Sequence, residues 1–310
     1  MGIEPGPSAG VSEEEEAGRE ILGLVREQVS LGPRVPGTPA HDSLADMLED
    51  RLRSRTSSVL RQRFPVPFRG QVIPCTNLIG AFRSAHPCAG PVLLGTHYDT
   101  RPRADRETNP ARRELPIPGA NDGGSGTAVF QHMLDWLSHQ DLPRDVLVAF
   151  FDAEDLGNID GKDFSIGAEW CVHHPPWDEP PSEVVVLDMV GGAGMVFDID
   201  AHSLTHPASR RLTSEIFHLG ASRGWKPFAA SKAQRVKYII SDHYPFVRRG
   251  IPACLLIDLD YPQWHTQDDT PQAMSTESLG ITEAALCIYL SRFRAQERRS
   301  SDASEGPSAP

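Results

Sequence analysis

The chain has 310 residues, 39% of them hydrophobic, and its 42 acidic and 30 basic residues give a formal net charge of -12. This acidic balance argues against a nucleic-acid partner, which normally requires a basic surface. Residues 1–20 lack the basic start and the apolar segment of a signal peptide, and no apolar stretch approaches the roughly 20 residues that span a bilayer. For the chain as given we therefore expect a cytoplasmic monomer without a membrane partner.

Two tails flank the region that is predicted to fold. Residues 1–14 and 296–310 are rich in Pro, Ser, Gly, Glu and Arg, a composition that predicts disorder. Residues 15–295 are predicted to form a single domain. The five cysteines are an odd number without C-x-x-C spacing, which is typical of scattered buried thiols and not of a disulfide framework.

Helical and strand patterns alternate along this domain. In chain order they predict helices over residues 14–31 and 41–54, strands over 76–82 and 91–95, a helix over 126–137, strands over 145–151, 184–187 and 195–199, a helix over 209–223, strands over 236–240 and 253–257, and a helix over 278–293. Residues 101–118 form a long loop, and loops of this length are usually functional or mobile. The alternation predicts an α/β fold with a central mixed, mostly parallel sheet flanked by helices.

Five segments place metal-binding side chains where a predicted strand ends or a predicted helix begins. These side chains are His97, Asp122, Glu154 with Asp155, Asp188 and His265. Imidazole and carboxylate are ligand types that zinc takes in catalytic sites, and ligands of open α/β sheets bind beyond the carboxyl ends of the strands. One such residue alone is usually a turn residue or a solvated side chain, but five segments at one edge indicate a metal site. Asp99, two residues after His97, is expected to orient that imidazole.

Further motifs resemble a known family. They are Leu31-Gly32-Pro33-Arg34-Val35-Pro36-Gly37-Thr38-Pro39, the late run Asp242-His243-Tyr244-Pro245-Phe246, and Trp264 directly before His265. Together with the five metal-type segments, over roughly residues 30–292, they resemble the zinc-dependent exopeptidase superfamily, which includes the di-zinc aminopeptidases and the animal-type glutaminyl cyclases. The further motifs favour the glutaminyl-peptide cyclotransferase branch.

The resemblance implies an enzyme that converts the N-terminal Gln of a peptide or protein into pyroglutamate and releases ammonia. Glu154 would be the general acid/base, Asp188 and Asp242 would belong to the proton network near the reacting amide, and Trp264 would line the substrate pocket. One catalytic zinc would be held by the side chains of Asp122, Asp155 and His265.

The same residues leave two alternatives open. In a di-zinc aminopeptidase, His97 and Asp188 would bind a second zinc and Asp122 would bridge the two ions. Glu154 would then take a proton from the attacking water. The other alternative is a non-catalytic binding module on this scaffold, and the intact Glu154 argues against it.

The chain departs from the cyclase pattern at two positions. Ser241 stands before Asp242, where cyclases usually carry an acidic residue, and Leu255 stands where animal cyclases place a His. Both departures modestly favour a peptidase or a divergent cyclase. Asp242 could also be an ordinary helix cap for residues 244–249. The other polar side chains near the motifs are expected to be turn and cap residues (Asp268 and Asp269) or a solvated loop face (Arg101, Arg103 and Arg106). The alternative for these arginines is a place at the mouth of the site.

Overall fold

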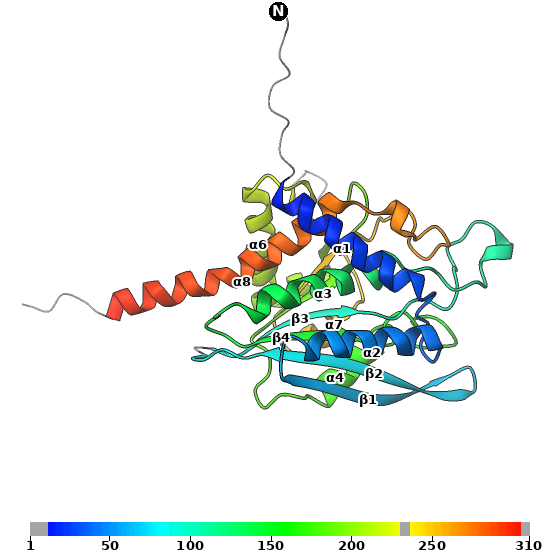
Figure 1. Cartoon of the computed structure of the whole chain (residues 1–310), viewed down its shortest axis with the longest axis horizontal. Coiled ribbons are helices and arrows are strands. Elements are labelled where there is room, and N and C mark those ends of the chain that lie inside the picture. Colours follow the sequence, from blue (N-terminus) through cyan, green and yellow to red (C-terminus); the bar gives the residue numbers. More distant parts are fainter. Residues whose placement is uncertain (1–11, 88, 230–235, 305–310) are drawn as a thin grey trace, which may run out of the picture.

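A computed structural model of the chain describes residues 12–87, 89–229 and 236–304. The main strands are β1 (Ser58–Phe68), β2 (Gln71–Phe82), β3 (Val92–His97), β4 (Val146–Phe151), β5 (Glu183–Asp188) and β8 (Ala253–Ile257). They form one six-stranded sheet in the order β1-β2-β4-β3-β5-β8. Figure 1 labels the first four of these strands. The two pairings that involve β2 are antiparallel, and β4, β3, β5 and β8 run parallel. The predicted α/β fold with a mixed, mostly parallel sheet is confirmed.

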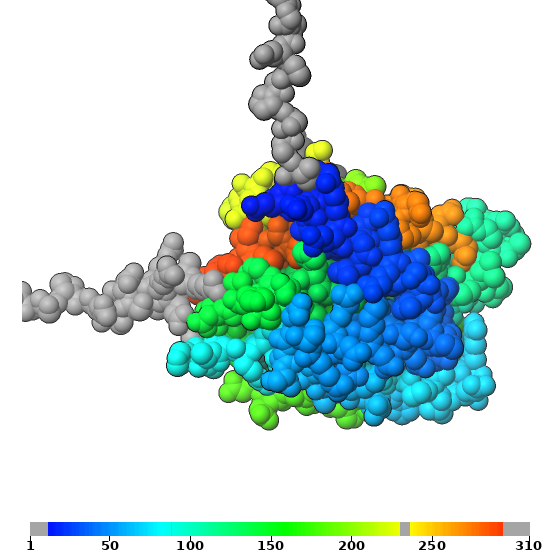
Figure 2. All heavy atoms as spheres, viewed as in Figure 1, coloured from blue at the N-terminus to red at the C-terminus, as the bar shows by residue number. Residues whose placement is uncertain are grey.

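Helices pack against both faces of this sheet. They are α1 (Glu13–Ser30), α2 (Pro39–Arg53), α3 (Gly124–Ser138), α4 (Ile166–His173), α5 (Ala201–Thr205), α6 (Pro207–Ser222), α7 (Tyr244–Arg248) and α8 (Thr276–Ser304). The two apolar cores follow the alternation of the strands: in β3, Val92 and Leu94 pack with α1, α3 and α8, whereas Leu93 packs with α4 and α7. In Figure 2, α1 and α2 (blue) occupy the centre of the near face, and α3 (green) lies beside them. No described helix is long and apolar enough to cross a bilayer.

The edge strand β1 is absent from the sequence-based prediction. Its sequence contains Pro65 and Pro67, which argue against a strand because proline cannot donate a ladder hydrogen bond. At the edge of the sheet that missing donor is tolerated. The strands predicted over residues 195–199 and 236–240 are much shorter, since only β6 (Ile199–Asp200) and β7 (Val236–Lys237) pair there. The N–H groups of Phe197 and Asp198 donate instead to two separate segments, at Pro227 and Ile257.

The ends of the domain differ from the predicted tails. α1 begins at Glu13, with the side chain of Ser12 as its N-cap, and α8 continues to Ser304. Residues 296–304, predicted to belong to a disordered tail, are therefore helical, while residues 1–11 and 305–310 lie outside the described residues. Of the cysteines, four are free thiols and Cys88 lies outside the described residues.

The parallel strands bring their carboxyl ends to one edge of the sheet. β3 ends at His97, β5 ends at Asp188, and β4 ends just before Glu154. Four residues at this edge that are not glycine have positive φ angles: Ala153 (57°), Ser165 (62°), Met189 (49°) and His265 (55°). Such backbone conformations carry a cost and cluster at functional sites, where the surrounding structure imposes them.

Candidate metal centre and active site

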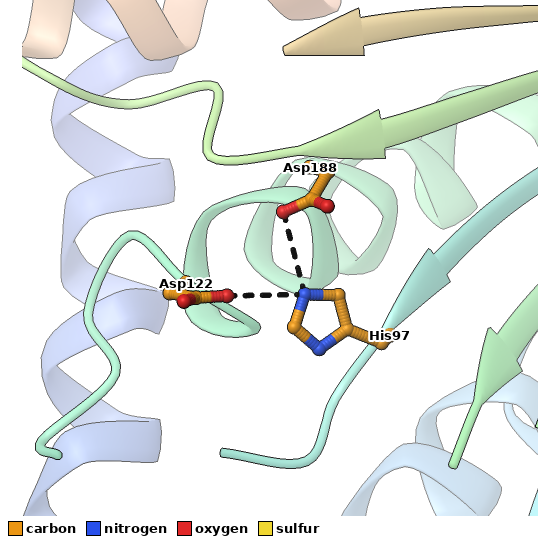
Figure 3. Close-up of side chains that lie close together, drawn as sticks. All are labelled: His97, Asp122 and Asp188. Carbon is orange, nitrogen blue, oxygen red and sulfur yellow. Dashed lines mark hydrogen bonds and ion pairs between the residues drawn. The ribbon is translucent and has the colours of Figure 1, made fainter. Parts of the chain in front are cut away.

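Asp122 belongs to two groups of buried metal-type ligands. His97, Asp122 and Asp188 form one group, and Asp122, Asp155 and His265 form the other; within each group the ligand atoms lie within 4.8 Å of one another. In the first group, His97 Nε2 lies 3.3 Å from Asp122 Oδ1 and 3.4 Å from Asp188 Oδ1 (Figure 3). The structure thus brings together all five ligand candidates that the sequence places on separate segments.

The second group has the donor set of a zinc site. His265 Nε2 lies 3.3 Å from Asp155 Oδ1 and 3.5 Å from Asp122 Oδ2. The oxygens Asp122 Oδ2 and Asp155 Oδ2 are buried and accept no hydrogen bond. A buried carboxylate oxygen without a hydrogen bond carries a large desolvation cost, which a cation would remove. One imidazole and two carboxylates therefore fit a zinc ion here.

The turn that carries Asp122 is held by a buried carboxylate that the sequence-based prediction assigned to an ordinary turn or cap. Asp269 accepts hydrogen bonds from the N–H groups of Asn121 (2.9 Å) and Asp122 (3.1 Å) and from the Tyr261 hydroxyl (2.9 Å). Burial is the largest cause that raises the pKa of Asp269 to about 7, and the negative charge of Asp122 is the second. Glycine is required at position 123, directly after Asp122, because φ is 81° there and a Cβ atom would lie 2.3 Å from the carbonyl oxygen of Asp99.

Asp99 ties two strand ends together. Its carboxylate accepts the N–H groups of Glu154 (3.0 Å) and Asp155 (3.1 Å), and Oδ1 lies 3.5 Å from His97 Nδ1. The carboxylate of Asp99 therefore fixes the backbone at the candidate ligand Asp155 and faces the imidazole ring of His97 on the side away from Asp122. This is the arrangement that orients metal-bound histidines.

Glu154 is buried at 4% exposure and accepts a hydrogen bond of 3.2 Å from Ser165 Oγ. Burial raises its pKa well above the usual range, the charge of His97 opposes that shift, and the nearby carboxylates of Asp242, Asp188 and Asp155 add to it. Glu154 belongs to neither ligand group. Its side chain is thus a carboxyl beside the metal-type residues that can both take and release a proton.

Asp188 and Asp242 lie on the other side of the site. Ser241 Oγ donates a hydrogen bond of 2.8 Å to Asp188 Oδ2. Asp242 is fully buried and neither of its carboxylate oxygens makes a hydrogen bond, so the alternative of a helix cap is wrong. Burial raises the pKa of Asp242 well above its usual range. The charge of His97 opposes this shift, and the charges of Asp99 and Asp188 add to it.

The loop over residues 101–118 reaches into the site. Asp105 Oδ1 lies 3.2 Å from His265 Nδ1, and Arg101 donates to both Asp105 (2.6 Å) and Asp155 Oδ1 (3.0 Å). Arg101 is 2% exposed, so the expectation of a solvated side chain is wrong for this residue. The loop over residues 101–118 is rich in Arg and Pro, a composition that is typical of exposed loops. No local sequence pattern therefore indicates that Arg101 contacts Asp105 and Asp155.

Trp264 forms a wall beside His265. The two ring centroids are 4.5 Å apart, and the guanidinium of Arg106 lies 3.8 Å from the centroid of the indole ring. A cavity of about 740 Å³ extends from this wall, and Ser165, the partner of Glu154, also lines it. The site therefore combines a polar centre with an apolar recess, as ligand-binding sites usually do.

Comparisons with known proteins agree with this geometry. Residues 77–290 match the sequence model of peptidase family M28. The glutaminyl-peptide cyclotransferase of Drosophila melanogaster is 26% identical over 277 residues, which cover 80% of this chain and 75% of that protein. The glutaminyl cyclase of Porphyromonas gingivalis has a TM-score of 0.79 and 28% identity, covering 89% of this chain and 98% of that chain. A Zn-dependent exopeptidase from Parabacteroides distasonis has a TM-score of 0.79 and 26% identity, covering 87% and 96%.

Proposed function

The chain belongs to peptidase family M28, and on that premise we propose that it is a zinc-dependent glutaminyl-peptide cyclotransferase acting on peptides or proteins with an N-terminal Gln. The observation that carries the proposal is the position of Glu154, buried beside the Asp122–Asp155–His265 group yet outside it. The relatives named as glutaminyl cyclases support the reaction, and the indole of Trp264 beside His265 supports the substrate pocket.

The reaction requires one proton to move between two nitrogen atoms. The α-amine of the substrate attacks the side-chain amide carbon of the same Gln residue, and the new C–N bond closes the five-membered lactam. Glu154 takes a proton from the attacking amine and delivers it to the amide nitrogen, whose bond to carbon breaks as ammonia leaves. The raised pKa of Glu154 suits a group that must act in both directions.

Zinc would be held by Asp122, Asp155 and His265, and when bound it supplies a Lewis acid that polarises the amide carbonyl. The residues around this site hold the substrate and exclude water. In this proposal Asp242 and Asp188, whose charges act on Glu154, accept hydrogen bonds from the substrate's amine or amide N–H groups. Trp264 shields one side of the reacting group, which favours attack by the substrate's own amine over attack by water.

A di-zinc aminopeptidase is the second candidate, because Asp122 is shared by two ligand groups. In that enzyme His97 and Asp188 would complete a second metal site, and Glu154 would deprotonate a water molecule instead of the amine. Zinc analysis of the purified protein separates the candidates. About one ion per chain supports the cyclase, and about two support the aminopeptidase.

Two substrates given to the purified protein test the proposal. Gln-β-naphthylamide should form pyroglutamyl-β-naphthylamide and ammonia, and Leu-p-nitroanilide should remain intact. Release of nitroaniline from the leucine substrate would overturn the cyclase in favour of the aminopeptidase. Inertness toward both substrates in a zinc-loaded protein would leave the non-catalytic binding module.

A further inference from the structure

A buried ion pair between His41 and Asp152 lies beneath the strand ends that carry the site. His41 Nε2 lies 2.8 Å from Asp152 Oδ1, and the two side chains are 2% and 0% exposed. Burial alone would lower the pKa of His41, but the charge of Asp152 and the hydrogen bond to it outweigh burial and raise this pKa to about 9. A buried ion pair contributes little net stability, because both charges lose their hydration. The pair therefore needs an explanation other than stability.

Asp152 joins three segments of the chain through its carboxylate. Besides the bond from His41 in α2, it accepts hydrogen bonds from the Thr76 N–H in β2 (2.6 Å) and from the Tyr98 hydroxyl (3.0 Å). Tyr98 directly follows His97, the last residue of β3, and Asp152 directly follows β4. The rings of His41 and Tyr98 stack with their centroids 5.1 Å apart. The network thus ties α2 to the ends of β3 and β4.

The turn after Asp152 contains a strained residue and then the acid/base. Ala153 has a φ of 57°, a conformation that is unfavourable for alanine and persists only where the surrounding structure imposes it. After the turn, Asp99 accepts the N–H group of Glu154 at 3.0 Å. Before the turn, the Asp152 carboxylate is anchored as described, and its N–H group donates to Asn77 Oδ1 at 3.1 Å. The strained turn is therefore held from both ends.

Neither member of the ion pair is placed to touch the substrate or a metal ion. His41 and Asp152 belong to neither ligand group, and neither lines the cavity that extends from Trp264. The other ring nitrogen, His41 Nδ1, makes no hydrogen bond, and its nearest carboxylate is the exposed Asp42 at 3.5 Å. Any effect of His41 on the reaction must therefore pass through Asp152 and the turn.

We propose that His41 is a positioning residue, which acts through Asp152 to fix the turn that carries Glu154 and thereby supports kcat. The inference rests on the proposed cyclase function, in which Glu154 moves the proton between the two nitrogen atoms. Proton transfer requires its acid/base to lie within hydrogen-bond reach, and a misplacement of about 1 Å can lower the rate about a hundredfold. The ion pair thus supplies geometric precision to the acid/base.

Steady-state kinetics on a Gln-initiated peptide, with rates normalised to zinc content, test this role. His41→Leu removes the partner of Asp152, so kcat should fall about tenfold or more while KM stays within about twofold of the wild-type value. His41→Gln supplies a neutral donor in its place and should restore kcat to within about threefold of wild type. Tyr98→Phe removes one hydrogen bond to the same carboxylate, keeps the ring and should lower kcat about threefold.

The matched control is His132→Gln. His132 is also a histidine paired with carboxylates, at 2.5 Å from Glu283 and 3.0 Å from Glu20, but it joins α3 to α8 and α1. Thermal unfolding of the same preparations separates stability from positioning. We expect both His41→Gln and His132→Gln to unfold at a lower temperature than wild type, whereas His132→Gln should keep the wild-type kcat.

The outcomes separate the two levels of the account. Wild-type kcat in His41→Leu and Tyr98→Phe overturns the positioning role while the cyclase stands. A rise in KM or a loss of zinc that accounts for the lost activity also overturns it, as does an equal loss of kcat in His132→Gln. If His41→Leu does not fold, His41→Gln and Tyr98→Phe decide by the same criteria. Absence of turnover in the wild-type protein overturns the cyclase, and the inference falls with it.

Discussion

The hydroxyl of Ser241 donates a hydrogen bond to the carboxylate of Asp188, with 2.8 Å between Ser241 Oγ and Asp188 Oδ2. The other carboxylate oxygen, Asp188 Oδ1, lies 3.4 Å from His97 Nε2. Ser241 stands where the resemblance to cyclases predicts an acidic residue. It orients Asp188 by a neutral donor and adds no further negative charge beside Asp242.

The change Ser241→Ala should lower kcat/KM about tenfold, because it removes a hydrogen bond to a charged, buried carboxylate. The matched control is Ser182→Ala, which removes a serine directly before β5, at the end of that strand opposite to Asp188, where Ser182 Oγ donates to Gly90 O. That control should keep the wild-type kcat/KM. Equal rates for the two variants would show that the Ser241 hydroxyl does not support the reaction.

The change Glu154→Gln should lower kcat by about a hundredfold or more while the zinc content stays constant, because the amide cannot transfer the proton. Glu154 lies outside both ligand groups, so the metal should not depend on it. Zinc analysis and steady-state kinetics on the same preparation check both parts. A parallel loss of zinc would show that Glu154 is a ligand, and the acid/base assignment would be wrong.

The change Asp105→Asn should weaken zinc binding by about ten- to a hundredfold, because it removes the negative acceptor that faces His265 Nδ1 at 3.2 Å. Competition with a chelator measures the change. Asp268→Asn serves as the control, since Asp268 is an exposed aspartate that forms an ion pair with Arg112. Unaltered zinc affinity in Asp105→Asn would mean that the loop over residues 101–118 does not support the metal ligand.

His132 joins three helices through two ion pairs. In α3, His132 Nδ1 lies 2.5 Å from Glu283 of α8, and Nε2 lies 3.0 Å from Glu20 of α1. The hydrogen bond that His132 donates to Glu283, partly opposed by burial, raises the pKa of His132 from 6.5 to about 9. A folded-state pKa above the unfolded value gives stability that is complete below about pH 6.5 and is lost as the pH rises through about 9.

Denaturant unfolding of wild type and His132→Gln at several pH values tests this contribution. The free energy of unfolding should differ by about 1 kcal/mol at about pH 6, and the difference should vanish near pH 10. Introducing Glu283→Gln into both proteins should remove most of this pH dependence. A constant difference across the pH range would show that the charge on His132 does not stabilise the helices.

The placement of the candidate ligand residues could be predicted because each adjoins a feature that is visible in the sequence. His97 and Asp188 end apolar runs, and parallel strands place such ends at one edge of the sheet. Asp122 precedes Gly123-Gly124, whose flexibility allows the turn into α3. At these positions the local sequence pattern and the topology of the sheet both predict that the side chain lies at the carboxyl edge of the strands.

The contacts of Asp269 and Arg101, which hold Asp122 and Asp155 in place, could not be predicted because the partners are distant in the sequence. Asp269 binds a turn 147 residues earlier, and Arg101 reaches Asp155 across 54 residues. Their local sequences are typical of surface loops, and only the tertiary structure buries them. Edge strand β1 was missed for a related reason, since Pro65 and Pro67 exclude a central strand but are tolerated at an edge.

Mass spectrometry of a Gln-initiated peptide incubated with the zinc-loaded protein tests the central claim most directly. We expect a product that retains every residue and is lighter by one ammonia, and Glu154→Gln should not form it beyond the uncatalysed rate. Release of free glutamine, with a peptide shortened by one residue, would contradict the cyclase and identify the protein as an aminopeptidase.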